Sequence, residues 1–289
     1  MRALYRIFLF QLSFLFVSGF ISGGVYAAAL QADEVSRTRV GYSFGVVPQF
    51  EQRKLFQIWR PILSELERRT GFRFVLKGSS KIPAFEQRFM AGGFDFAYMN
   101  PYHLVIASSS QGYIPLIRDG GRSLHGILVV RKDSGIETVA QLAGKTISFP
   151  SPNALGASLL MRAELKGTFG IDFEPKYVQT HSSVYLHILK NLVDAGGGVT
   201  QTLELQKPSI KNNLKVLFET RGIATHPVAV HPRVPVEHQM RVRNALLDMA
   251  AGKRGKDLFR QVPIKQVVAA SMSDYESITK WGLDKYYVP

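Results

Sequence analysis

Short apolar runs and helix-like patterns alternate along the chain from Arg39 onwards. Residues 40–47 predict a strand, and the next segment has apolar residues three and four positions apart, which is typical of a helix that ends at Gly71. Pro61 should bend or divide that helix. Further strands are predicted at 72–76, 94–99, 127–130, 146–149, 176–179 and 215–218, and further helices at 84–91, 102–109, 136–142, 154–165, 183–192 and 236–250. This alternation favours βαβ units and a largely parallel sheet in an α/β protein.

The chain is long enough for two compact units. Without a leader, about 260 residues remain, which is more than one average core needs. Two stretches are suited to carry the chain between lobes, at 123–130 and at 220–235, the second rich in Pro and His. The predicted division places residues 33–124 and 231–289 in lobe 1, residues 125–222 in lobe 2 and a return hinge at 223–230. A cleft between such lobes is lined by loops at the carboxyl ends of strands.

The first 29 residues have the features of a signal peptide. Arg2 and Arg6 form a positive start, residues 7–21 are mostly apolar, and Ala27 begins a run of three small residues suited to cleavage. The apolar run is interrupted by polar residues and is too short to span a membrane comfortably. The chain has no cysteine, which argues against a lipid anchor and against disulfides. We therefore expect a periplasmic protein with no membrane anchor.

The chain is strongly basic. It has 36 Lys and Arg residues against 22 Asp and Glu residues, a net charge of +14, and loss of Arg2 and Arg6 with the leader leaves +12. Such an excess attracts anions at long range. The predicted export of the protein argues against a nucleic-acid partner. The basic residues are scattered along the sequence, so most of them are consistent with a solvated surface. No His, Asp and Glu cluster has metal-ligand spacing, and we expect neither a metal nor a cofactor.

Polar and aromatic side chains stand at the end of the strand predicted at 94–99. Tyr98 and Tyr102 offer hydroxyl donors suited to an oxyanion, and Asn100 offers an amide. Each tyrosine is equally consistent with ordinary packing.

A second candidate segment, residues 149–158, joins a strand to a helix start. The start of a helix presents free backbone N–H groups and a partial positive charge, which suit an anion. Ser151 and Asn153 could contact a ligand, but capping alone would also explain Asn153.

A third candidate is His181, between a strand and the next helix. A histidine there could donate to an oxyanion and change its charge near neutral pH, although a lone histidine is more often structural. Asp194 ends the following helical stretch. The glycines at 196–198 resemble a loop of close approach, but they lack the Lys-Ser/Thr ending of a phosphate-binding loop.

These segments, taken in order, resemble the phosphonate/phosphite/phosphate-binding family of periplasmic ABC-transporter solute-binding proteins. The resemblance rests on Phe-Gly-Val-Val-Pro at 44–48, Asp-Phe-Ala-Tyr-Met-Asn-Pro-Tyr at 95–102, Phe-Pro-Ser-Pro-Asn at 149–153, Thr-His-Ser-Ser-Val at 180–184 and Val-Asp-Ala-Gly at 193–196. It implies a type II periplasmic binding fold, with two α/β lobes joined by two crossover strands and a ligand cleft between them. The implied ligand contacts are Tyr98, the backbone of Asn153, Ala154, Leu155 and Gly156, His181 and Asp194.

The chain departs from this family at the helix start. Family members have a Ser-Thr-Ser-Gly run where residues 154–157 read Ala-Leu-Gly-Ala, so three hydroxyl donors are missing. Each lost hydrogen bond to a charged group is worth roughly 1.5 to 3 kcal/mol. Ser182 stands where an acidic residue often follows the histidine, which favours a simple anion over an aminoalkyl phosphonate.

Three classes of function remain in view. The first is a monomeric transport receptor that closes on a small oxyanion and delivers it to an ABC-transporter permease. The second is a ligand-binding accessory of a membrane sensor. The third is an exported hydrolase that uses His181 with Ser182 or Ser183, but adjacent residues cannot easily form a nucleophile and base pair, and no Gly-x-Ser-x-Gly elbow is present. We therefore expect a binding protein and not an enzyme.

Overall fold

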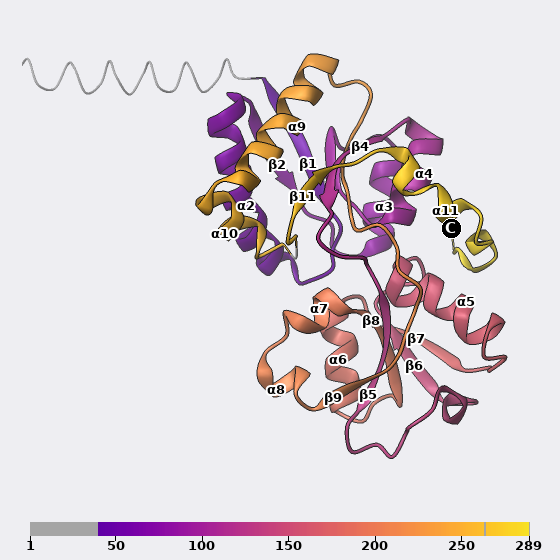
Figure 1. Ribbon diagram of the computed structural model, residues 1–289. Helices are drawn as coiled ribbons and strands as arrows, with labels where there is room; N and C mark the ends of the chain where they lie inside the picture. Colours follow the sequence, from indigo (N-terminus) through magenta and orange to yellow (C-terminus); the bar gives the residue numbers. More distant parts are fainter. Residues whose placement is uncertain (1–39, 263, 289) are drawn as a thin grey trace, which may run out of the picture. The chain divides into compact units, whose positions relative to one another are not determined.

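The protein is a mixed α/β structure with two β-sheets (Figure 1). The structure is a computed structural model that describes residues 40–262 and 264–288. The signal peptide predicted at 1–29 and residues 33–39 of the predicted lobe 1 lie outside the described residues. None of the helices in the described part of the chain is long and apolar enough to cross a membrane.

The first sheet has six strands in the order β11-β4-β10-β3-β1-β2. Its strands are β1 (Gly41–Val46), β2 (Arg73–Lys77), β3 (Phe96–Tyr98), β4 (Ile114–Asp119), β10 (Val228–Val230) and β11 (Val267–Ala269). Its helices are α2 (Gln52–Thr70), α3 (Ile82–Met90), α4 (Pro101–Gln111), α9 (Val236–Ala251) and α10 (Lys253–Phe259). The helices α2, α9 and α10 pack together on one side, and α3 packs on α4 (Figure 1). The last segment adds η3 (Met272–Asp274), α11 (Glu276–Thr279) and η4 (Leu283–Tyr286).

The second sheet has five strands in the order β7-β6-β8-β5-β9. Its strands are β5 (Gly126–Arg131), β6 (Thr146–Phe149), β7 (Glu174–Tyr177), β8 (Ala195–Val199) and β9 (Leu214–Glu219). Its helices are η1 (Val139–Leu142), η2 (Leu155–Leu159), α5 (Leu160–Gly167), α6 (His181–Leu189), α7 (Thr200–Glu204) and α8 (Pro208–Lys211). Because side chains alternate along a strand, Leu128 and Val130 of β5 share a core with α5, whereas Ile127 and Val129 share one with α6.

Both sheets are mixed, so the largely parallel sheet that the sequence suggested is corrected. Strand β1 is parallel to β2 and β3, and β6 is parallel to β7 and β8. All the pairs made by β10, β11 and β5 are antiparallel.

Pro61 does not divide α2 into two helices, one of the two outcomes that the sequence predicted, and a bend at Pro61 stays a prediction. The helix runs from Gln52 to Thr70 with Pro61 inside it and ends at Gly71, which has a left-handed backbone. Ile58 and Ile62, on either side of Pro61, are both buried in the same core. This shared packing holds the helix together across the hydrogen bond that proline cannot donate.

The three glycines at 196–198 form part of the buried strand β8 and not a loop. A Cβ atom at Gly197 would lie 1.9 Å from the carbonyl oxygen of Ala157, and one at Gly198 would lie 2.3 Å from the hydroxyl of Tyr185. The glycines therefore allow a close approach between parts of the protein itself, because they let η2 and α6 pack tightly on β8.

The chain crosses between the sheets twice. It leaves the first sheet after β4 and enters the second at β5, and it returns between β9 and β10 (Figure 1). The backbones of Leu124 and Ile223 exchange hydrogen bonds of 2.8 and 2.9 Å, so the crossing segments lie side by side. The lobe boundaries that we placed at 124, 222 and 230 stay predictions, because Gly41–Pro289 forms one compact unit.

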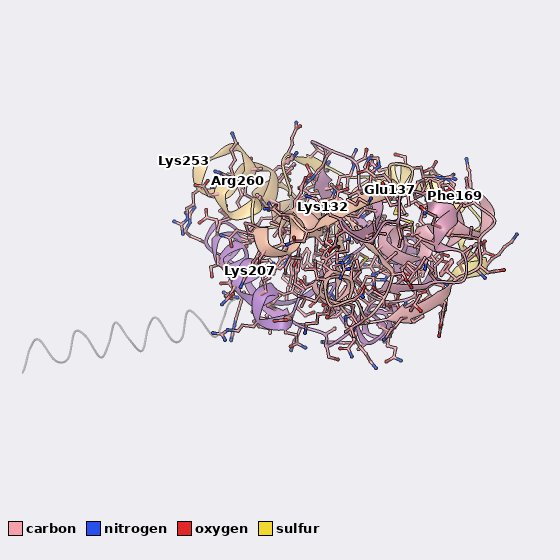
Figure 2. All side chains as sticks on the ribbon, turned by 90° about the horizontal axis from the view of Figure 1, so that it is seen from below. Lys132, Glu137, Phe169, Lys207, Lys253 and Arg260 are labelled. Atoms are coloured by element: carbon pink, nitrogen blue, oxygen red, sulfur yellow. The ribbon has the colours of Figure 1, made fainter. Side chains whose placement is uncertain are left out.

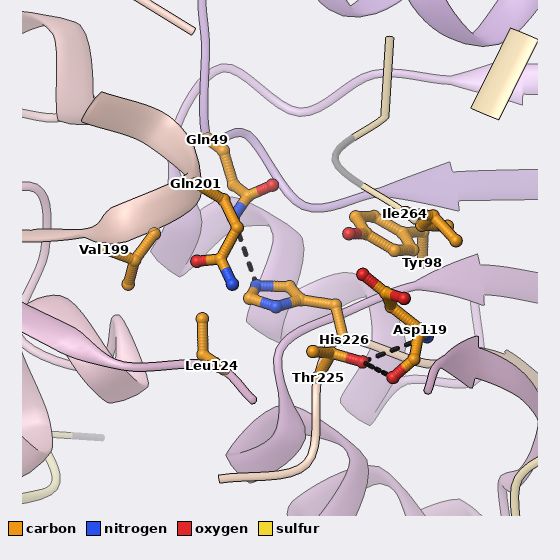
Figure 3. Close-up of a pocket in the computed structure, with 9 residues that line it drawn as sticks. All are labelled: Gln49, Tyr98, Asp119, Leu124, Val199, Gln201, Thr225, His226 and Ile264. Carbon is orange, nitrogen blue, oxygen red and sulfur yellow. Dashed lines mark hydrogen bonds between the residues drawn. The ribbon is translucent and has the colours of Figure 1, made fainter. Parts of the chain in front are cut away.

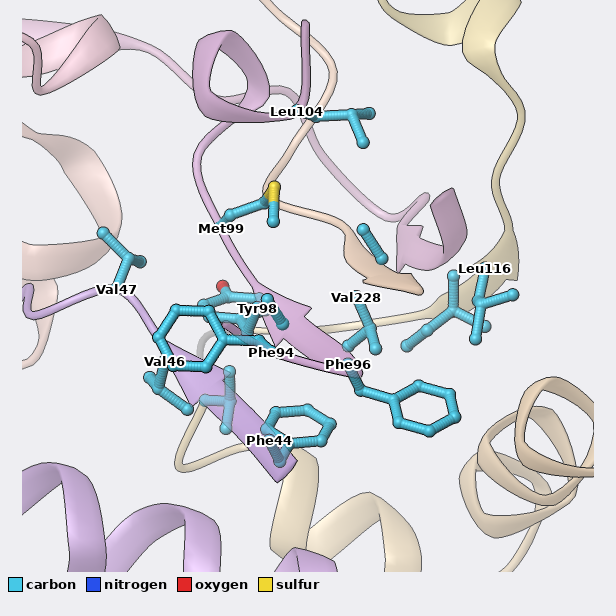
Figure 4. Close-up of a cluster of buried hydrophobic side chains, with 14 of the residues drawn as sticks. Phe44, Val46, Val47, Phe94, Phe96, Tyr98, Met99, Leu104, Leu116 and Val228 are labelled. Carbon is cyan, nitrogen blue, oxygen red and sulfur yellow. The ribbon is translucent and has the colours of Figure 1, made fainter. Parts of the chain in front are cut away.

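The core of the first sheet fixes the end of β3. Phe44, Phe94 and Phe96 are buried around Tyr98, as Figure 4 shows. A Cβ atom at Gly45 would lie 2.7 Å from the Phe94 ring, so glycine is needed there for the ring to lie across β1. This rigid aromatic layer holds the carboxyl end of β3, and with it Tyr98, at the edge of the sheet that faces the crossing segments.

Candidate functional site

Two adjoining cavities lie where the crossing segments meet the ends of β3 and β8. The first is lined by Gln49, Tyr98, Asp119, Leu124, Val199, Gln201, Thr225, His226 and Ile264 (Figure 3). The second is lined by Val47, Gln49, Ile82, Asn100, Ala154, Leu155, Gly156, Ala157, His181, Val199 and His226. Three residues, Gln49, Val199 and His226, line both.

Each sheet supplies one wall of these cavities at the ends of its strands. Gln49 follows β1 and Tyr98 ends β3, whereas Val199 ends β8 and His181 opens α6. Open α/β sheets bind ligands at these strand ends. The cavities are small, about 20 Å³ and about 10 Å³, which is room for roughly one water molecule each. An anion of several atoms therefore requires the cavities to widen.

Tyr98 lies between two other rings. It stacks on His226 with the ring centres 5.4 Å apart, and its centroid is 4.9 Å from that of Trp59. Burial, reinforced by the nearby Asp119 carboxylate, raises the pKa of the Tyr98 hydroxyl. The hydroxyl therefore keeps its proton at neutral pH and can donate a hydrogen bond.

His226, on the return crossing, is a site residue that the sequence analysis missed. Its Nε2 atom lies 3.2 Å from the side-chain nitrogen of Gln49. Burial lowers the pKa of His226 to about 3, and the nearby His103 and His181 rings contribute to this decrease. The sequence signal for this position was the high content of Pro and His in residues 220–235, which indicated a crossing segment but did not single out His226.

His181 is buried at the first position of α6. Its Nδ1 atom lies 3.2 Å from the hydroxyl oxygen of Thr202. That hydroxyl donates to the carbonyl of Val199 at 2.9 Å and also contacts the Tyr185 hydroxyl at 2.8 Å. Burial lowers the pKa of His181 to about 3, so its ring is neutral at physiological pH.

The segment after β6 brings backbone groups to the second cavity. A π-helical turn, η2, starts at Leu155 and runs into α5. The first N–H groups of a helix have no acceptor within it, and Leu155, Gly156 and Ala157 all line the second cavity. A Cβ atom at Gly126 would lie 2.0 Å from the carbonyl oxygen of Gly156, so β5 and η2 touch through their backbones.

Asn153 neither caps the helix nor lines a cavity. Its amide nitrogen donates to Glu86 at 3.2 Å and to the carbonyl of Val288 at 2.6 Å, and its oxygen accepts from the Val288 N–H at 2.9 Å. The segment that ends at Val288 is too distant in sequence for this contact to be foreseen. Ser151 is buried beside it, with no hydrogen-bond partner for its hydroxyl among the described residues.

Asn100 does line the second cavity, but it also has a structural role. Its side-chain oxygen caps α4 by accepting from the His103 N–H at 2.8 Å, and its nitrogen donates to the carbonyl of Asn153 at 3.3 Å. Tyr102, by contrast, lines neither cavity and packs against Tyr287, with the ring centres 5.8 Å apart.

Asp194 is the predicted site residue that the structure places farthest from the cavities. It immediately precedes β8, whereas the cavities lie at Val199 at the other end of that strand, roughly 16 Å away at about 3.3 Å per residue. Its carboxylate accepts from the Thr146 N–H at 3.0 Å and pairs with Lys145 at 3.6 Å. In this structure the Asp194 carboxylate holds the start of β6 and does not line a cavity, and a contact with ligand stays a prediction.

Asp119 is a second residue that sequence reasoning missed. Its carboxylate accepts from the backbone N–H groups of Gly121, Lys265 and Gln266 at 2.9 to 3.0 Å and from Arg122 at 3.3 Å. These bonds occupy its acceptor positions and tie the first crossing to the segment before β11. Asp119 therefore shapes the first cavity but does not need a ligand.

Gln201 also lines the first cavity without having been predicted. Its nitrogen donates to the carbonyl of Ser123 at 3.2 Å, which fixes the orientation of the amide. Its oxygen is buried and has no hydrogen-bond partner in the described part of the chain. Residues 40–262 and 264–288 contain no group of three His, Cys, Asp or Glu residues that could hold a metal ion.

Comparison with known proteins identifies the family. The model of the periplasmic substrate-binding proteins of ABC phosphonate transporters matches residues 44–275. A binding-protein component of an ABC phosphonate transporter from Pseudomonas aeruginosa superposes with a TM-score of 0.78 at 17% identity, covering 86% of this chain and 87% of that one. PhnD1 from Prochlorococcus marinus, in complex with methylphosphonate, has a TM-score of 0.78 at 16% identity, with 86% and 99% covered. A Xanthomonas citri protein bound to chloride has a TM-score of 0.68 at 16% identity, with 85% and 98% covered. At these identities the three structures establish the shared fold.

Proposed function

The chain belongs to the family of periplasmic substrate-binding proteins of ABC phosphonate transporters, and we propose that it holds a small phosphorus oxyanion in the two adjoining cavities. Members of this family are the solute-binding components of transporters and work with a permease. The two-sheet α/β fold is the fold of such binding proteins. The proposal concerns the ligand of this chain and the residues that hold it.

The observation that carries the proposal is the set of neutral donors that meets in the cavities. Leu155, Gly156 and Ala157 line the second cavity at a helix start, where backbone N–H groups have no acceptor within the helix, and Tyr98 lines the first cavity. No Asp or Glu lines the second cavity. Fixed N–H and O–H dipoles can hold a desolvated anion without a full positive charge.

The basic residues act at longer range. No Lys or Arg lines either cavity, and basic side chains such as Lys132, Lys207, Lys253 and Arg260 project from the surface (Figure 2). A positive surface of this kind raises the local concentration of small anions and speeds their arrival. We infer that surface charge attracts the ligand, whereas the neutral cavity selects it.

Methylphosphonate, phosphite and phosphate are the leading candidates. PhnD1 from Prochlorococcus marinus is in complex with methylphosphonate, and the two cavities of this chain would have to widen to admit an anion of that size. Residues 154–157 lack the hydroxyl donors typical of the family, so the backbone N–H groups and Tyr98 carry more of the binding.

Calorimetric titration of the purified protein without residues 1–29 tests this proposal. We expect binding and a raised melting temperature with at least one of methylphosphonate, phosphite and phosphate. Tyr98→Phe removes one hydrogen bond to a charged group and should weaken binding by about tenfold or more. Tyr102→Phe is the matched control, because Tyr102 packs on Tyr287 outside the cavities. A lack of binding to every phosphorus oxyanion would refute the proposal.

We further propose that the chain is exported by cleavage after the leader at 1–29, works as a monomer and carries out no catalysis. Among the described residues, the ring of His181 bonds to Thr202, whereas Ser183 bonds to Thr180 through its hydroxyl and Ser182 accepts from Gln206. Neither serine is therefore placed as a nucleophile activated by His181. Detection of the shortened chain in a periplasmic fraction, and its mass in solution, test export and oligomeric state.

A further inference from the structure

The hydrogen bonds behind His181 determine which of its ring nitrogens carries the proton. Two hydroxyls reach the buried Val199 carbonyl, that of Thr202 at 2.9 Å and that of Tyr185 at 3.3 Å, and the shorter contact makes Thr202 the donor. The proton of Thr202 is then used, so its oxygen can only accept from Nδ1 of His181, 3.2 Å away. The Tyr185 hydroxyl, 2.8 Å from the same oxygen, supplies its own proton to this network. With the proton on Nδ1, the Nε2 atom of His181 is a hydrogen-bond acceptor.

Nε2 of His181 has no hydrogen-bond partner in residues 40–262 and 264–288, and His181 lines the second cavity. The adjoining cavity has an acceptor of its own, because the side-chain oxygen of Gln201 is buried without a partner. Figure 3 shows the Gln201 amide beside His226 and Val199, the residues that the two cavities share. A fully deprotonated oxyanion has only acceptor oxygens, so it would leave both of these buried acceptors without a donor.

The opposite wall presents donors. Leu155, Gly156 and Ala157 line the same cavity as His181, and they stand at a helix start, where N–H groups have no acceptor within the helix. A ligand that fits both walls therefore needs acceptor oxygens on one side and a hydroxyl on the other. Building on the proposed function, we propose that the site takes the oxyanion in its singly protonated form, with the P–OH group donating to Nε2 of His181.

The charged and titratable groups around His181 do not supply this proton near neutral pH. These groups are Tyr185 on α6, Glu204 on α7 and Lys211 on α8. Across the cavities they are His226, Tyr98 and Asp119. Burial raises the pKa of both tyrosines, and burial lowers the pKa of both histidines to about 3. Glu204 pairs with Arg122, and the Asp119 carboxylate accepts four N–H donors. The ligand must therefore bring the proton.

Calorimetry as a function of pH tests this inference on the wild-type protein. Methylphosphonate and phosphite are titrated separately between about pH 5.5 and about pH 9. If only the monoanion binds, the affinity falls by about tenfold per pH unit above the second pKa of the ligand. The midpoint of that fall should differ between the two ligands by the difference in their own pKa values. Sulfate, which carries no proton in this range, should bind at least about tenfold more weakly than the monoanions.

The outcomes separate the two proposals. Absence of binding to every phosphorus oxyanion at every pH contradicts the proposed function. Binding that is independent of pH, or that falls at the same pH for both ligands, overturns only the inference about protonation. Equal affinity for sulfate and methylphosphonate overturns it as well.

Thr202→Val tests the positioning role of the hydroxyl behind His181. The change keeps the shape, leaves Tyr185 free to donate to Val199, and releases the ring of His181 to take either tautomer. The expected result is a loss of about tenfold or more in the preference for the monoanion over the dianion. Thr200→Val is the control, because its buried hydroxyl has no partner in the described residues. An unchanged pH profile in Thr202→Val, or the same change in Thr200→Val, would overturn the assignment.

Discussion

Burial sets the charge state of two histidines in this protein. His181 and His226 are both buried at the cavities, and burial lowers the pKa of each to about 3 from an ordinary value of 6.5. Neither ring can act as a cation at neutral pH, which separates this site from one that binds an anion by charge. His181 contributes through the direction of its hydrogen bonds instead.

The two buried histidines should make the fold sensitive to acid. In the unfolded chain each ring takes up a proton below about pH 6.5, whereas in the folded protein it does so only near pH 3, so acid favours unfolding in this window. Each ring contributes a loss of about 1.4 kcal/mol per pH unit. The measurement is urea unfolding between about pH 4 and about pH 7. His226→Gln should give a shallower slope. Equal slopes in wild type and His226→Gln would contradict this account.

At the scale of elements, the turn η2 at the start of α5 is the part of the site that departs most from the family. Its first residues face the second cavity with backbone groups and apolar side chains, where hydroxyls are expected. Strand β8 lies against it through Gly197, with no room for a side chain between them. The position of the donors is therefore fixed by packing, although the number of donors is reduced.

Ala154→Ser should restore part of what this element lacks. Ala154 is buried and lines the second cavity, so a hydroxyl there can add one hydrogen bond to the ligand, worth about 1.5 to 3 kcal/mol when the acceptor is charged. We expect the affinity for methylphosphonate to rise by about tenfold in calorimetry. Ala140→Ser, on the exposed side of η1, serves as the control. An affinity at or below that of the wild type would show that the hydroxyl does not reach the ligand.

The sequence predicted elements well where periodicity was strong and long, as in α2 and α9. It missed β10 and β11, which have three residues each and are too short to show an alternating pattern, and it also missed the six-residue β4. It misread β8 as a loop, because three glycines carry no apolar signal.

For the site, Tyr98, Asn100, His181 and the helix start do line the cavities. The sequence did not indicate Gln201 and His226 as cavity residues, and it did not indicate that the Asn153 side chain bonds to Val288. The position of each of these three side chains depends on contacts between distant parts of the chain, which a local sequence pattern does not show.

At the scale of the whole molecule, the last segment of the chain contacts the elements of the second sheet. Arg162 of α5 donates to the carbonyl of Tyr286 at 2.6 Å, and Asn153 exchanges hydrogen bonds with Val288. Arg221 pairs with Glu164 and lies over the Trp281 ring. These contacts lie away from the cavities but join the same two sheets, so they stabilise the arrangement in which the site is enclosed.

Arg162→Ala should speed release of the ligand. Loss of the bond to Tyr286 destabilises the enclosed arrangement of the protein relative to a more open arrangement. More of the free energy of ligand binding is then needed to stabilise the enclosed arrangement. We expect the dissociation rate of methylphosphonate, measured by stopped-flow, to rise several-fold. Arg260→Ala is the control, because Arg260 pairs only with Asp257 on the exposed side of α10. An unchanged dissociation rate in Arg162→Ala would exclude this role.

The paired hydrogen bonds between Leu124 and Ile223 also restrict how such a protein can move. Two separate linkers would each bend freely, whereas two crossing segments joined by the bridge between Leu124 and Ile223 should bend together about a single axis. Opening is then a rotation with one degree of freedom, and every contact across the cavities must break along the same coordinate. Release of the ligand should follow a single exponential, and its rate constant should be sensitive to changes at either linker.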